Sequence, residues 1–81
     1  MADIKMYGTT WCGDCTRAKR FFDDNGIGYD WINIEEDGAA FEVVLERNQG
    51  KRVVPTIVFP DGSHLSEPTN RALAQKLGMA D

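Results

Sequence analysis

Four stretches of the chain have the pattern of β-strands. Residues 4–7 alternate between apolar and polar side chains and stop at a glycine, and residues 29–34 are rich in aromatic and β-branched side chains. Residues 53–59 form the most apolar stretch and are interrupted at Pro55, and residues 63–65 follow a Pro-Asp-Gly turn. Short runs of this kind, bounded by turn residues, are typical of strands. We therefore expect four strands at these positions.

Three further stretches repeat apolar residues at the three- and four-residue spacing of an amphipathic helix. The first covers residues 13–25 and the second residues 39–48, and a glycine that suits a helix end follows each of them closely. The third is expected to begin at Pro68, because a proline at the first helical position has no N–H to leave unpaired. The positions expected to face the core are Cys15, Ala18, Phe21 and Phe22, then Ala40, Phe41, Val44 and Leu45, then Ala72, Leu73 and Leu77.

The predicted elements follow the order β-α-β-α-β-β-α. The first three form a βαβ unit, whose two strands should be parallel. The turn at Asp61 and Gly62 should make the last two strands antiparallel. We therefore predict an α/β fold with a four-stranded mixed sheet and three helices. A chain of 81 residues suffices for one core, so residues 1–81 are expected to form a single domain.

Charge and hydropathy argue against several classes of function. The chain has 13 acidic and 9 basic residues, a net charge of -4, and lacks the basic stripe that nucleic-acid binding requires. No apolar run approaches the roughly 20 residues of a membrane span, and the first residues lack the apolar region of a signal peptide. We expect a cytoplasmic monomer with neither a nucleic acid nor a membrane as partner.

Both cysteines lie in the sequence Thr-Trp-Cys-Gly-Asp-Cys at residues 10–15, where the first strand should lead into the first helix. The two-residue spacing brings the sulfurs of Cys12 and Cys15 within bonding range, and a helix start favours a thiolate through its unpaired N–H groups and its dipole. A disulfide here would close a very short loop and stabilise the fold by only about 2 kcal/mol. We therefore predict a redox site, with Cys12 as nucleophile and Cys15 as resolving thiol.

Three neighbours of the cysteines are candidate site residues. A carboxylate beside a thiolate disfavours the thiolate, so Asp14 is hypothesised to moderate Cys12 or to select a cationic partner. The alternative is an exposed loop residue with little effect on the thiol. Trp11 can pack against a substrate or cover the edge of the core, and Thr10 can offer a hydroxyl to the thiolate.

The element order, with Cys-x-x-Cys after the first strand, resembles the thioredoxin fold. The length and the absence of extra N-terminal elements point to the glutaredoxin branch of that fold. More narrowly, Trp-Cys-Gly-Asp-Cys at residues 11–15, Val-Val-Pro-Thr at residues 53–56 and Asp-Gly-Ser at residues 61–63 are similar to the mycoredoxins. These are small glutaredoxin-like proteins that work with mycothiol, and the resemblance covers nearly the whole chain.

The resemblance implies a thiol-disulfide oxidoreductase that holds no bound cofactor. Its electron donor would be a low-molecular-weight thiol, mycothiol or glutathione. Its substrates would be mixed disulfides between proteins and that thiol, and also protein disulfides.

The resemblance also implies a cis Val54–Pro55 peptide bond opposite the cysteines. The Val54 backbone would then pair with an extended thiol substrate, as an added strand would. The far end of the substrate groove would lie at Asp61, Gly62, Ser66, Glu67 and Thr69. The candidate substrate-binding residues are therefore Thr10, Trp11, Asp14, Val54, Pro55, Gly62 and Ser66.

Two departures from glutathione-dependent members argue against glutathione as the physiological thiol. Many of those proteins have a lysine shortly before the first cysteine, where this chain has Gly8, Thr9 and Thr10. They also have a Gly-Gly pair after the last strand, where residues 65–69 here read Leu-Ser-Glu-Pro-Thr. The lysine that would pair with a glutathione carboxylate is thus absent, and Glu67 would repel that carboxylate.

Three alternatives remain open. One is a redoxin that depends on thioredoxin reductase and donates electrons to ribonucleotide reductase, although the Trp-Ser-Gly-Phe-like segment of those proteins is absent. Another is a protein that holds an iron–sulfur cluster between two subunits, through the first cysteine and two small thiols. The third is a protein-binding domain with an incidental dithiol. A zinc site is not expected, because two cysteines and the single His64 fall short of four ligands.

Overall fold

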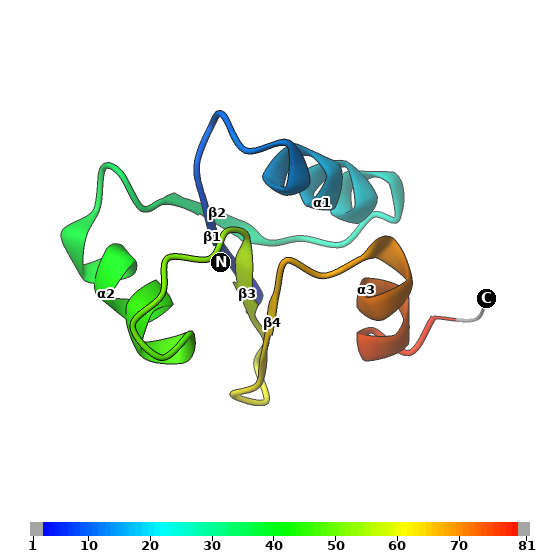
Figure 1. The fold of residues 1–81 in the computed structure, drawn as a ribbon. Coiled ribbons are helices and arrows are strands. Elements are labelled where there is room, and N and C mark those ends of the chain that lie inside the picture. Colours follow the sequence, from blue (N-terminus) through cyan, green and yellow to red (C-terminus); the bar gives the residue numbers. More distant parts are fainter. Residues whose placement is uncertain (1–2, 80–81) are drawn as a thin grey trace.

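The computed structural model describes residues 3–79 of the chain. Figure 1 shows helices on both faces of a central sheet, with α1 and α3 on one face and α2 on the other. The predicted order of elements and the predicted α/β architecture are confirmed. The elements are β1 (Lys5–Gly8), α1 (Gly13–Asp24), β2 (Asp30–Asn33), α2 (Gly38–Arg47), β3 (Thr56–Val58), β4 (His64–Ser66) and α3 (Asn70–Lys76).

The sheet is mixed, with the strand order β2-β1-β3-β4. β1 is parallel to β2 and antiparallel to β3, and β4 is antiparallel to β3, as the connections predict. Tyr7 pairs with Ile32 on one side and with Thr56 on the other, and Thr56 in turn pairs with Ser66. The end of β1, the start of β3 and the end of β4 therefore meet at one end of the sheet, where the chain enters α1. The turn between β3 and β4 lies at the opposite end (Figure 1).

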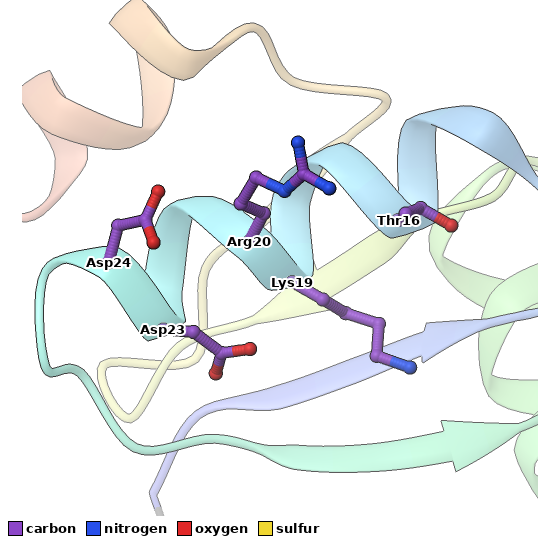
Figure 2. A pocket seen from close by; sticks show the side chains of 5 residues that line it. All are labelled: Thr16, Lys19, Arg20, Asp23 and Asp24. Carbon is purple, nitrogen blue, oxygen red and sulfur yellow. The ribbon is translucent and has the colours of Figure 1, made fainter.

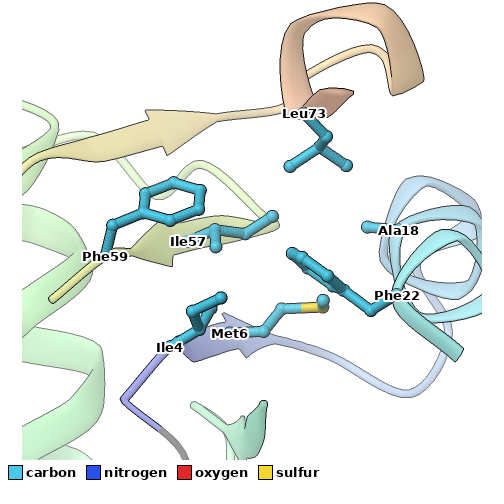
Figure 3. Packing of buried hydrophobic residues seen from close by; sticks show 7 residues of the cluster. All are labelled: Ile4, Met6, Ala18, Phe22, Ile57, Phe59 and Leu73. Carbon is cyan, nitrogen blue, oxygen red and sulfur yellow. The ribbon is translucent and has the colours of Figure 1, made fainter. Parts of the chain in front are cut away.

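Apolar side chains fill both layers of the molecule. Between the sheet and the pair α1 and α3, Phe22 and Leu73 are fully buried against the strands, and Figure 3 shows them converging there. Burying side chains of this size stabilises the fold by about 1.5–3 kcal/mol each. Leu45, expected to face the core, is only half-buried. Val43, which was not expected there, packs against the cluster between the sheet and α2. The first layer contains Ile4, Met6, Ala18, Phe22, Ile57, Phe59 and Leu73, and the second contains Tyr7, Ile34, Ala40 and Val44.

Two predicted boundaries are wrong. β3 begins at Thr56, not at residue 53, because Pro55 has no N–H to donate to a strand ladder. α3 begins at Asn70, not at Pro68, because the Thr69 side chain accepts the N–H of Ala72 at 3.0 Å and so caps the helix. The other boundaries agree with the sequence prediction to within one residue.

Within residues 3–79 the structure contains no helix with the length and apolar character needed to span a bilayer.

Candidate active site

Cys12 is the N-cap residue of α1. Its backbone is extended, and its sulfur accepts the main-chain N–H of Cys15 over 3.2 Å. The Cys12 carbonyl accepts the N–H of Thr16, which is the first hydrogen bond of the helix. The thiol is half-buried, so it lies at the surface with an N–H group and the positive end of the helix dipole directed at it. Both features stabilise a thiolate.

Cys15 lies one turn further along and is only 1% exposed. Burial, helped by the hydrogen bond with the Cys12 side chain, raises the pKa of the Cys15 thiol to about 12. Both cysteines are free thiols. The pair is thus asymmetric: one sulfur is accessible and the other is held protonated in the interior.

Gly8, at the end of β1, makes room for the buried sulfur. A Cβ atom at this position would lie 2.5 Å from the Cys15 sulfur and 2.8 Å from the ring of Trp31. Only a glycine fits between the two without displacing one of them, because such contacts are far inside van der Waals distance. The end of β1 therefore packs directly against the Cys15 sulfur.

The segment before β3 faces the accessible sulfur. The Cys12 thiol donates to the Val54 carbonyl, with 3.7 Å between sulfur and oxygen. The Val54–Pro55 peptide bond is cis, as the resemblance implies, and Pro55 is buried. The Pro55 carbonyl accepts the N–H of Glu67 at 2.9 Å, which ties this segment to the residue after β4.

The structure brings some of the predicted site residues together. Cys12, Cys15, Val54 and Pro55 converge at the end of the sheet where α1 begins. Thr10 and Trp11 lie on the exposed loop just before Cys12, and Trp11 is 62% exposed.

Other predicted residues are not brought to the sulfurs. Gly62 lies in the turn between β3 and β4, at the opposite end of the sheet, and its carbonyl accepts from Arg47. Its neighbour Asp61 accepts from Lys76 at 2.7 Å, and this interaction holds the pKa of the Asp61 carboxyl far below its usual range. Ser66 is at the correct end, but its hydroxyl donates to the Asn48 side chain.

Asp14 and Arg17 connect the cysteine loop to the start of α3. The Asp14 carboxylate lies 3.3 Å from the Arg17 guanidinium, and both side chains are partly exposed. Arg17 also donates to the Pro68 carbonyl at 3.0 Å and to the Asn70 side chain at 2.9 Å. Asp14 therefore belongs to an ion pair on the surface, beside the predicted groove.

Two residues that the sequence analysis does not single out border Trp11. The indole N–H of Trp11 donates to the Glu35 carboxylate at 3.1 Å, and the Arg52 guanidinium lies 5.0 Å from the centre of the indole ring. Glu35 follows β2 and Arg52 precedes the Val54 segment, so only the folded topology brings them together.

A surface hollow of about 410 Å³ follows the outer side of α1 and is separate from this site. Figure 2 shows side chains of both charge signs along it, from Thr16 near the cysteines to Asp24 at the end of the helix. Mixed charges on one exposed helix face are typical of a solvated surface. Across residues 3–79 there is no group of three or more His, Cys, Asp or Glu side chains placed to bind a metal ion.

Comparison with known proteins identifies the family. The Glutaredoxin family model matches residues 4–65. A candidate glutaredoxin of Mycobacterium tuberculosis is 43% identical over 94% of this chain and 90% of its own length. Mycoredoxin 1 of Corynebacterium glutamicum is 34% identical over 95% of each chain.

Solved structures agree with this result. A glutaredoxin from Archaeoglobus fulgidus is 28% identical and superimposes with a TM-score of 0.79 over 95% of this chain and 87% of its own. The glutaredoxin-like NrdH-redoxin from Escherichia coli is 26% identical, with a TM-score of 0.77 over 96% of this chain and 97% of its own. The four-stranded sheet with three helices is therefore the thioredoxin-like glutaredoxin fold. The chain belongs to the glutaredoxin family and is a thiol-disulfide oxidoreductase.

Proposed function

We propose that this protein reduces mixed disulfides between proteins and mycothiol, with Cys12 as the nucleophile. The observation that carries the proposal is the asymmetry of the two thiols. The Cys12 sulfur is accessible and accepts an N–H at a helix start, whereas Cys15 is buried and its pKa is raised. Because the thiolate is the attacking species in disulfide exchange, the first sulfur is suited to attack an incoming substrate and the second is not.

The reaction begins with attack of the Cys12 thiolate on the sulfur that the small thiol contributes to the mixed disulfide. That disulfide breaks, and a new disulfide joins Cys12 to the small thiol. The protein substrate leaves as a thiolate and takes up a proton from solvent. A second small thiol, as its thiolate, then attacks the sulfur of the bound small thiol. This step releases an oxidised dimer of the small thiol and restores the Cys12 thiolate.

Cys15 provides the second route, which serves protein disulfides. The Cys12 thiolate first attacks one sulfur of the protein disulfide, and the other sulfur leaves as a thiolate that takes up a proton from solvent. The Cys15 thiol then loses its proton, and its sulfur attacks Cys12 in this mixed disulfide, releases the second protein thiolate and closes a disulfide between residues 12 and 15. Two molecules of the small thiol reduce that disulfide again and leave as their oxidised dimer. The raised pKa of Cys15 makes its thiolate scarce near neutral pH, so this route is expected to be slower than resolution by a small thiol.

The Val54 backbone is proposed to hold the substrate. The carbonyl of Val54 lies 3.7 Å from the Cys12 sulfur, so a disulfide bound to Cys12 would extend along this segment. A substrate backbone that pairs with Val54 would add a short strand at the end of the sheet. The exposed Trp11 would border the other side of the reacting disulfide.

Mycothiol is proposed as the donor for two reasons. Mycoredoxin 1 is similar to this chain over 95% of its length. The lysine and the Gly-Gly pair of many glutathione-dependent members are absent, and Glu67 is exposed where a glutathione carboxylate would approach. A second candidate donor is thioredoxin reductase, favoured by the similarity to NrdH-redoxin, a protein described as having a thioredoxin-like activity profile.

The test compares three donors on the oxidised protein: mycothiol, glutathione, and NADPH with thioredoxin reductase. We expect mycothiol to be fastest in reduction and in turnover of a protein–mycothiol mixed disulfide, and the Cys12→Ser variant to be inactive. A clear advantage of glutathione would overturn the choice of mycothiol, and a clear advantage of the reductase would support the second candidate. Visible absorbance of anaerobically purified protein would instead support binding of an iron–sulfur cluster.

A further inference from the structure

A network of hydrogen bonds is centred on Asn48, the residue that ends α2. Its amide group donates to the Val44 carbonyl at 2.7 Å and to the Thr56 hydroxyl at 3.0 Å, and its amide oxygen accepts from the Ser66 hydroxyl. The two N–H donors and the oxygen are thus all engaged, which fixes the orientation of the amide. The side chain joins the end of α2 to the start of β3 and the end of β4.

The network extends to the segment that faces Cys12. Thr56 is fully buried, and its hydroxyl donates to the Val53 carbonyl at 2.7 Å. On the other side of Val54, the Pro55 carbonyl accepts the N–H of Glu67. The carbonyls of the two residues that flank Val54, Val53 and Pro55, are therefore both held by hydrogen bonds.

We propose that Asn48 is a positioning residue for the active site, which acts through Thr56 and Val53 to hold the Val54 backbone opposite Cys12. This inference rests on the proposed function, in which Val54 pairs with the substrate. Thr56 is buried and Asn48 and Ser66 are partly buried, and a polar network with engaged donors and acceptors in such surroundings makes the segment around it more rigid. If the Val54 segment is already rigid, binding of the substrate does not have to order it, and less conformational entropy is lost on binding. The network therefore contributes to substrate binding without touching the substrate.

The network also gives Ser66 a different role from the one that the sequence predicts. Its hydroxyl is committed to the Asn48 amide, so it supports the network instead of contacting the substrate. Thr56 is the link between Asn48 and the Val53 carbonyl. Replacing Thr56 with valine retains the branched shape and removes only the hydroxyl.

The chain contains a matched control for Asn48. Asn25 ends α1, and its side-chain amide donates to the Phe21 carbonyl at 2.8 Å, as the Asn48 amide does to the carbonyl four residues earlier. Asn25 is exposed and lies at the far end of α1 from Cys12. Asn25→Ala therefore removes the same helix-capping hydrogen bond as Asn48→Ala, without disturbing the network around Thr56.

The experiment measures KM and kcat for an extended peptide disulfide, together with the rate at which iodoacetamide alkylates Cys12. We expect Thr56→Val and Asn48→Ala to raise KM about three- to tenfold, the effect of losing one hydrogen bond. The alkylation rate should stay within about twofold, because this small reagent needs no pairing with Val54. Asn25→Ala should change neither KM nor the alkylation rate of Cys12.

The inference is overturned if the wild type is active and Thr56→Val leaves KM unchanged, or if Asn25→Ala raises KM as much as Asn48→Ala. Should Asn48→Ala fail to fold, Thr56→Val decides the question on its own, with its native state verified by circular dichroism. Failure of the proposed function is a different outcome. In that case the wild type does not reduce mixed disulfides, or Cys12→Ser reduces them equally well.

Discussion

The main-chain N–H of Cys15 donates to the sulfur of Cys12 over 3.2 Å, while the sulfur of Cys15 itself is 1% exposed. The backbone of Cys15 thus donates to the Cys12 sulfur, the proposed nucleophile, while the Cys15 side chain is buried away from solvent. Because Cys12 is the N-cap residue, the same hydrogen bond also closes the first turn of α1. The hydrogen bond that caps α1 therefore also involves the sulfur proposed to carry out the redox chemistry.

This relationship predicts selective alkylation of the reduced protein. At pH 7 we expect iodoacetamide to modify Cys12 about tenfold faster than a free cysteine, because the helix start stabilises the reacting thiolate. Cys15 should stay unmodified until denaturant is added. Mass spectrometry of the peptides at successive times gives both rates, with Cys12→Ser as the control. Equal labelling of the two cysteines in the native protein would contradict the prediction.

The buried Cys15 thiol also predicts a loss of stability at alkaline pH. Its pKa rises from an ordinary value of 9.0 to about 12 on folding. Between these values the unfolded chain releases a proton that the folded protein retains. The stability that Cys15 contributes is therefore complete below pH 9 and falls by up to about 1.4 kcal/mol per pH unit as the pH rises towards 12.

Urea denaturation of the reduced protein at pH 7.5, 9 and 10 measures this dependence. In Cys15→Ala the free energy of unfolding is lower throughout, because a cavity replaces the sulfur, but its decline above pH 9 should be shallower. The other groups that titrate in this range, Tyr29 included, are common to both proteins. Parallel pH profiles would show that Cys15 is not the group responsible.

The ion pair beside the cysteines predicts two unequal effects. Asp14→Asn should lower the free energy of unfolding by less than about 0.5 kcal/mol, because the pair is half-exposed. Arg17→Met should cost about 1–2 kcal/mol, because it also removes the hydrogen bonds to the Pro68 carbonyl and Asn70. Urea denaturation of both variants and of the double variant checks this, and equal costs would contradict it.

The same variant tests the hypothesis that Asp14 moderates the nucleophile. If the Asp14 carboxylate acts on the thiolate, Asp14→Asn should raise the rate of Cys12 alkylation at pH 7. Arg17 lies 3.3 Å from Asp14 and compensates part of its charge, so we expect a change of less than about threefold. An unchanged rate would remove the electrostatic role and leave Asp14 as a partner of Arg17.

The sequence predicts what depends on local patterns. The strand-to-helix position of Cys12 and the burial of Ala18 and Phe22 follow from spacing, because helix periodicity fixes which side chains face the sheet. The sequence does not decide where α3 starts, because Pro68 and Thr69 both suit a helix start. The side-chain hydrogen bond of Thr69 determined the outcome.

The contacts around the active site could not be predicted in the same way. Asn48 reads locally as the end of a helix, and nothing in its neighbours indicates contact with Thr56 and Ser66. Such contacts depend on the register of β3 against β4, which places Thr56 opposite Ser66. The resemblance predicts Gly62 in the substrate groove. In the structure it lies in the turn between β3 and β4, at the end of the sheet opposite the cysteines.

Two glycines near the cysteines predict opposite responses to the same substitution. A Cβ atom at Gly13, the first residue of α1, meets no atom within 4 Å. Gly13→Ala should therefore stabilise the protein by about 0.5–1 kcal/mol, because alanine restricts the unfolded chain and favours the helix. Gly8→Ala should cost about 1–3 kcal/mol, because the added methyl group would overlap the Cys15 sulfur and the ring of Trp31.

The two glycine variants also test whether the end of β1 keeps the Cys15 thiol inaccessible. Displacement of the Cys15 sulfur in Gly8→Ala should make this thiol accessible to iodoacetamide in the native protein, whereas Gly13→Ala should leave it protected. Thermal unfolding gives the stabilities, and peptide mass spectrometry gives the labelling of each cysteine. If Cys15 stays unlabelled in a folded Gly8→Ala protein, then other atoms, such as the ring of Trp31, move to accommodate the methyl group and the Cys15 sulfur stays in place. In that case the end of β1 would not be what holds the Cys15 thiol in the interior.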